Sequence, residues 1–231
     1  MEIQKYIYNY DYNAITTAVY SSASVFALYP IVKIYLHHNY ENFNLLPSHK
    51  QYYVVKNLIK SSMLLGLCIM VIPTIVVPVY MNGTWSNYWC HRLGILYTTN
   101  DYMGLLLVDK LPKTTQDHHK ITTILCVISL GIDFQTSTLG QMLFVYTIAS
   151  ASSYLVNFYL GARLLYKEKQ LQLVRSQARN IYFVSCLVNW GWHIHWCIRN
   201  YDLLYLQHLL YFLFLTFIIK DDIILLGWLN K

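Results

Sequence analysis

The chain has 231 residues, of which only 12% are charged and 56% are hydrophobic. A soluble domain normally has about a quarter of its residues charged, so this composition excludes a water-soluble globule, a disordered chain and a small disulfide scaffold. The formal charge of +6 comes from 17 Lys and Arg that are spread between long apolar runs. This spread argues against a nucleic-acid partner and favours an integral membrane protein.

Seven apolar segments approach the length of about 20 residues that a transmembrane helix needs. We therefore expect an all-α polytopic protein, with one helix in residues 1–49 and six in a unit formed by residues 50–231. The residues before the first helix, Glu2, Lys5 and Asp11 among them, show no cleavage site and predict a signal anchor. The expected helices are 14–36, 58–81, 88–108, a fourth based on 121–134, then 138–162, 180–198 and 203–219.

The fourth segment is the shortest, because residues 121–134 make only about 21 Å of helix. To cross a bilayer, this helix must include part of residues 114–120. That extension brings Asp117, His118 and His119 into the outer part of the bilayer or into a polar cavity. The alternative is a re-entrant hairpin of the fourth and fifth segments, which changes the side on which every later segment lies.

The distribution of Lys and Arg predicts the orientation, because these residues resist translocation. With seven helices, one side holds only Lys5, Arg92 and Arg199. We therefore expect a lumenal amino terminus and a cytosolic carboxyl terminus. The glycosylation motif at Asn82 also falls on the lumenal side. The opposite side holds Lys33, Lys50, Lys56, Lys60, Lys110, Lys113, Lys120, Arg163, Lys167, Lys169, Arg175, Arg179, Lys220 and Lys231.

The most basic connection, residues 163–179, has a net charge of +4 and has leucines at near-helical spacing. It predicts an interfacial helix on anionic lipid, or simply the basic cytosolic loop that the topology requires.

The adjacent pair His118 and His119 is the first candidate for catalysis. Imidazoles act as general bases, proton shuttles or nucleophiles toward acyl groups. Adjacent residues on a helix point about 100° apart, so one ring is expected to face a cavity while the other supports it. The alternative is a histidine pair at the membrane–water boundary, without a chemical role.

Asp101 is the second candidate, because it lies about 10 Å inside the third helix by helical rise. A carboxylate at that depth needs a partner. We expect it to meet the histidine pair and to orient one imidazole, with Tyr97 one turn away. The alternative is that Asp101 is protonated, or bonded to Asn100 and Tyr97 within a packed bundle.

Other polar residues carry weaker predictions. His193 and His195 are two residues apart and diverge on a helix, so we expect no metal site and no cofactor. Cys90 and Cys197 both fall at lumenal helix ends, where either a disulfide or free thiols fit the sequence.

Three segments carry a resemblance to a known family. They are Tyr97-x-x-x-Asp101, the connection 110–113, and Asp117-His118-His119-Lys120 with the apolar run that follows it. Together they resemble the TLC-domain family, which includes the ceramide synthases, the TRAM proteins and smaller lipid proteins of the endoplasmic reticulum. The resemblance covers roughly residues 50 to 228, and the Ser-rich segment 140–157 is similar to that of the smaller members.

The resemblance implies a six-helix barrel that holds a long acyl chain, with one additional helix beside it. In ceramide synthases, the histidine pair is at the centre of acyl transfer from acyl-CoA to an amine. Those enzymes have further acidic residues on the helix after the glycine, whereas residues 144–152 here contain none. We therefore do not expect ceramide synthesis itself.

The predicted function is that of a multi-pass membrane protein that binds a fatty-acyl lipid or acyl-CoA in its barrel and contributes to lipid metabolism or membrane lipid homeostasis, with acyl transfer as the reaction that the family resemblance implies. His118 or His119 would act as base or nucleophile, with Asp101 and Tyr97 beside them. Two alternatives remain open: a lipid sensor without catalysis, and a TRAM-like or cargo-binding factor. The sequence specifies no protein partner.

Overall fold

The computed structural model describes residues 12–203 and 205–231, so Glu2, Lys5 and Asp11 lie outside the described residues. Every regular element within these ranges is a helix, which confirms the all-α class. The long elements are α2 (Tyr12–Asn39), α4 (Ser48–Val71), α6 (Asn87–Leu107), α7 (Lys113–Ser129), α8 (Thr138–Ala151), α9 (Tyr154–Ala162), α10 (Glu168–Arg199) and α11 (Leu206–Leu229).

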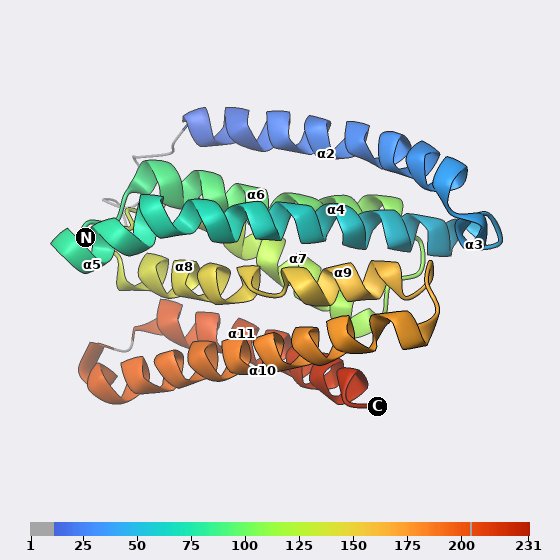
Figure 1. Ribbon diagram of the computed structural model, residues 1–231. Coiled ribbons are helices and arrows are strands. Elements are labelled where there is room, and N and C mark those ends of the chain that lie inside the picture. Colours follow the sequence, from blue (N-terminus) through green and yellow to red (C-terminus); the bar gives the residue numbers. More distant parts are fainter. Residues whose placement is uncertain (1–11, 204) are drawn as a thin grey trace.

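The connections alternate between the two ends of the bundle (Figure 1). Short helix α3 (Glu41–Asn44), the α6–α7 and α9–α10 connections and the carboxyl terminus lie at one end. The α5–α6, α7–α8 and α10–α11 connections lie at the other end. We call the end that holds α3 and the carboxyl terminus the basic end, because Lys50, Lys110, Lys167 and Lys231 lie there.

Within the described residues, six rods pack into a ring; five are single helices, and the sixth is the broken helix pair α8–α9. Helix α4 contacts α6, α6 contacts α7, and α7 contacts α11; α11 contacts α10, α10 contacts α8 and α9, and α9 returns to α4. Helix α2 lies outside this ring against α4 and α6. Away from the basic end, α8 also contacts α6, α7 and α11. There the interior is filled by a cluster that includes Leu93, Phe134, Met142 and Phe144.

Prolines and serines set the local breaks in the rods. Pro73 lies in a π-helical turn (Ile72–Val76) that continues α4 into α5 (Val77–Asn82). Proline removes a backbone N–H, which favours such an irregular turn within a helix. Gly83 ends α5 with φ +65, a left-handed conformation that glycine adopts without strain. Helices α8 and α9 are separated at Ser152 and Ser153 and bent by 43°.

Within the part of the chain that the structure describes, two helices, Asn13–Asn39 and Ser48–Asn82, are long and apolar enough to cross a membrane. The bent pair α8–α9 makes a third if it forms one span. The count of seven transmembrane helices stays a prediction, because the other rods carry more polar side chains, many of them directed into the bundle.

Several predicted boundaries were wrong. Helix α4 begins at Ser48 rather than at residue 58, so Lys56 lies inside a helix and not in a loop, and Lys60 lies well inside the helix rather than near its start. Helix α11 continues past residue 219 to Leu229 and includes Asp221 and Asp222. Both errors have one cause: an apolarity scan ends a helix at charged residues, whereas here those residues face a polar interior.

Two further predictions concern the basic end. Helix α7 includes the polar prefix 114–120, as a crossing fourth helix requires, but ends at Ser129. The basic segment 163–179 is not a separate interfacial helix, because from Glu168 onward it is the first part of the continuous helix α10.

Candidate functional site

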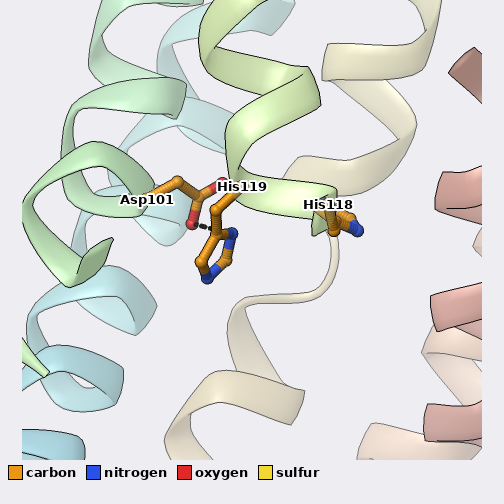
Figure 2. A group of neighbouring side chains, drawn as sticks. All are labelled: Asp101, His118 and His119. Carbon is orange, nitrogen blue, oxygen red and sulfur yellow. Dashed lines mark ion pairs between the residues drawn. The ribbon is translucent and has the colours of Figure 1, made fainter. Parts of the chain in front are cut away.

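Asp101 lies on α6 and is fully buried, with 0% exposure. It forms an ion pair with Lys60 of α4, and its Oδ1 also lies 3.1 Å from Nδ1 of His119 (Figure 2). The expected contact between Asp101 and the histidine pair is therefore present, through His119. The lysine is an additional partner that the sequence did not predict.

The other ring nitrogen of His119 faces α4. Its Nε2 lies 2.9 Å from Nζ of Lys56, one turn before Lys60. Asn100 donates a hydrogen bond of 3.1 Å to the carbonyl oxygen of Lys56 and accepts one of 3.4 Å from Tyr29 on α2. Both nitrogens of His119 therefore contact groups of the protein, and the outer helix is connected to the site.

Tyr97 does not bond to Asp101, so the alternative in which Tyr97 and Asn100 satisfy that carboxylate is wrong. The Tyr97 hydroxyl lies 3.3 Å from the hydroxyl of Tyr146, which in turn lies 3.3 Å from Nε2 of His118. Tyr97 therefore belongs to the surroundings of His118 rather than to those of Asp101.

The ring of His118 lies edge-on beside that of His119, with ring centroids 5.6 Å apart, but its Nδ1 contacts a different carboxylate (Figure 2). Its Nδ1 lies 3.4 Å from Oδ2 of Asp221 on α11. The neighbouring Asp222 accepts a hydrogen bond of 2.7 Å from Tyr182 on α10. Two acidic residues of the last helix therefore lie on the His118 side of the site.

These side chains border a cavity of about 280 Å³ at the basic end of the ring. Its polar lining includes Lys56, Lys60, His118, His119, Arg163, Asp221 and Asp222, and its apolar lining includes Val156, Leu160, Ile224, Leu225 and Trp228. Asp101 is not part of this lining, because it lies behind Lys60 and His119. The cavity thus combines a reactive polar region with an apolar wall.

One atom each of Asp101, His118 and His119 lies within 4.8 Å of the other two, a spacing that a metal ion could bridge. Two observations argue against that use. The Lys60 ammonium already neutralises Asp101, and the Lys56 amine contacts His119. A divalent cation would either have to displace both lysine side chains or bind despite the repulsion between like charges.

The remaining candidates lie away from this cavity. His193 is buried and contacts the Asn189 carbonyl oxygen and the Tyr211 hydroxyl, both at 2.8 Å, which is a packing role. Cys90 and Cys197 are free thiols. Asn82 is exposed at the end of α5, opposite the basic end.

The sequence reasoning missed four charged residues of the site, Lys56, Lys60, Asp221 and Asp222. A signal for them was present. Lys56 and Lys60 are spaced i, i+4 and so share one helix face, and the two aspartates lie within the apolar run 206–229.

No protein-family model matches this chain, and neither a curated protein nor a solved structure matches it. The likeness to the TLC-domain family therefore rests on the residues named above.

Proposed function

We propose that this chain is a TLC-type membrane protein that holds the acyl chain of a lipid inside its ring of helices and presents the acyl carbon to His118. The observation that carries the proposal is the cavity, which places His118 and Asp221 beside an apolar wall formed by α9 and α11. An amphipathic ligand fits such a site, with its hydrocarbon chain on the wall and its polar group at the histidines.

The chemistry that suits this geometry is acyl transfer. His118 would take the proton of an amine or hydroxyl acceptor while that acceptor attacks the acyl carbon and the leaving group departs. Asp221, 3.4 Å from Nδ1, would stabilise the imidazolium that forms. Acyl-CoA is the donor that the family resemblance implies.

The same proposal includes the topology. Seven rods with alternating connections fit seven crossings, with the basic end in the cytosol and the amino terminus in the lumen of the endoplasmic reticulum. The cavity would then open toward the cytosolic leaflet, where acyl-CoA is available to a membrane protein.

A second candidate is a lipid sensor without catalysis. It is favoured by the histidine pair itself, because both ring nitrogens of His118 and of His119 contact protein groups, as expected of a structural network. Lipid binding by the cavity is common to both candidates, so the chemistry at His118 separates them.

The test is a lipid analysis of cells that express wild type, His118→Ala or His119→Ala at equal levels. Transfer by His118 predicts that His118→Ala loses the lipid change that wild type produces, while Asp202→Asn, an exposed control, keeps it. If both histidine variants reproduce every wild-type change, catalysis by the pair is refuted and the sensor is favoured.

A further inference from the structure

Lys56 is a buried amine that lines the cavity and is only 3% exposed. Its neighbour Lys60 forms an ion pair with the carboxylate of Asp101. Among the described residues, no carboxylate forms an ion pair with Lys56, and its amine instead lies 2.9 Å from Nε2 of His119. Two lysines one turn apart therefore have different surroundings.

The missing counter-ion matters for reactivity. Burying an ammonium group without a paired anion is costly, whereas burying a free amine is much less so. A desolvated free amine is the reactive form in lysines that act as nucleophiles. The surroundings of Lys56 thus favour its nucleophilic form, whereas the amine of Lys60 is engaged in the ion pair with Asp101.

His119 is oriented so that one of its ring nitrogens can accept a proton from this amine. Because Asp101 lies beside Nδ1, the proton of a neutral imidazole belongs on that nitrogen, which leaves Nε2 as the acceptor. That acceptor faces Lys56. Asp101, His119 and Lys56 therefore form a row of carboxylate, imidazole and nucleophile, which is the order found in relay-activated nucleophiles.

We propose that Lys56 captures a long-chain aldehyde in the cavity as a reversible Schiff base. This inference rests on the lipid-binding part of the proposed function, because the apolar wall must hold the chain, but it does not need acyl transfer. An aldehyde is favoured over a thioester because an amide bond to Lys56 would consume the residue, whereas an imine is released by water.

The reaction balances without an oxidant or a reductant. The Lys56 nitrogen forms a bond to the aldehyde carbon while the C=O π bond breaks, and His119 Nε2 moves the proton from nitrogen to the carbonyl oxygen. The resulting carbinolamine loses one water molecule and forms the C=N bond. Addition of water reverses both steps and returns the aldehyde.

The experiment uses the full chain purified in detergent, with hexadecanal and sodium cyanoborohydride, which reduces an imine to a stable secondary amine. Peptide mass spectrometry then measures the alkylated fraction of each lysine. We expect the Lys56 fraction to exceed that of Lys50, an exposed lysine on the same helix, by about tenfold or more. The proposal is overturned if the alkylated fraction of each lysine simply increases with the solvent exposure of its side chain, or if Lys56 is not alkylated.

Two variants refine the result. Lys56→Arg should remove the adduct from this position, and His119→Gln should slow its formation about tenfold or more; an unchanged rate in His119→Gln overturns the relay. The distribution of alkylation over the lysines of the wild-type chain decides the proposal even if a variant folds poorly, because that measurement needs no substitution.

A parallel measurement separates this inference from the proposed function. A fatty acid that carries a photoactivatable diazirine should crosslink to peptides of α9 and α11 in wild type and in Lys56→Arg. Crosslinking without aldehyde capture overturns only the Schiff base, whereas the absence of both overturns lipid binding as well.

Discussion

Lys60 on α4 forms an ion pair with Asp101 on α6, and both side chains are buried. The pair joins two neighbouring helices of the ring at the depth where His119 contacts the same carboxylate oxygen. A buried pair of this kind stabilises little relative to apolar residues, but losing one partner leaves an uncompensated buried charge.

We therefore expect Asp101→Ala to lower the free energy of unfolding by about 3–5 kcal/mol. The matched control is the exposed pair Lys113 and Asp117, where Asp117→Ala should cost less than about 1 kcal/mol. Thermal unfolding in detergent measures both. Similar losses for the two variants would contradict a special role of the buried pair.

Asp221 should matter for function rather than for folding. Asp221→Asn keeps the shape of the side chain but removes the charge beside Nδ1 of His118. We expect a loss of about 10–100-fold in the lipid change that wild type produces, as for other residues that orient a catalytic group. Quantitative lipid analysis at matched expression checks this, with Asp202→Asn as the exposed control, and an unaffected Asp221→Asn would contradict the orienting role.

Gly104 offers a way to move Lys56 without removing it. A Cβ at this position would lie 2.9 Å from Cε of Lys56, whereas a Cβ at Gly94 on the same helix meets nothing within 4 Å. Gly104→Ala should therefore shift the amine away from His119 and reduce hexadecanal capture. Gly94→Ala should unfold at or above the wild-type temperature, because alanine favours a helix over glycine by about 1 kcal/mol, whereas the displacement of buried Lys56 offsets this gain in Gly104→Ala. Equal capture by the two variants would show that the amine position does not matter.

The hydrogen bonds of Asp133, at the end opposite the cavity, lead us to expect that the folding stability depends on pH. Hydrogen bonds from Asn87, at 2.7 Å, and from Thr136 and the Gln135 N–H hold the pKa of Asp133 below its usual range. Because the folded-state pKa is depressed, its stabilising contribution is complete above the unfolded value of about 3.9 and is lost as pH falls through the folded value. Unfolding temperatures between pH 6 and 3 should fall less steeply for Asp133→Asn than for wild type, and equal slopes would refute the assignment.

The orientation is tested with epitope tags at both termini, probed after selective permeabilisation. The basic end should be cytosolic, so the carboxyl-terminal tag should be accessible first. Tags that are both accessible on one side would favour the re-entrant hairpin. If Asn82 carries a glycan, Asn82→Gln should remove a mobility shift that an N-glycosidase also removes.

The helical class and the contact between Asp101 and the histidine pair followed from the sequence, because a deep carboxylate in a long apolar segment needs a partner. The identity of the full site did not. Asp221 lies beyond the helix end that hydropathy predicts and Lys60 lies near the predicted start of another helix, and only the packing of α4 and α11 around α6 and α7 brings them together. Apolar periodicity locates helices but carries no information on which polar faces meet inside a ring.

The hydrogen bond from Tyr29 to Asn100 gives the outermost helix a mechanical connection to the reactive region. Asn100 also donates a hydrogen bond to the carbonyl oxygen of Lys56, so two hydrogen bonds connect α2 to the backbone of the residue whose amine lines the cavity. Helix α2 has a largely apolar outer surface that includes Val19, Phe26 and Ile31, so only two hydrogen bonds separate whatever covers this surface from the backbone of Lys56.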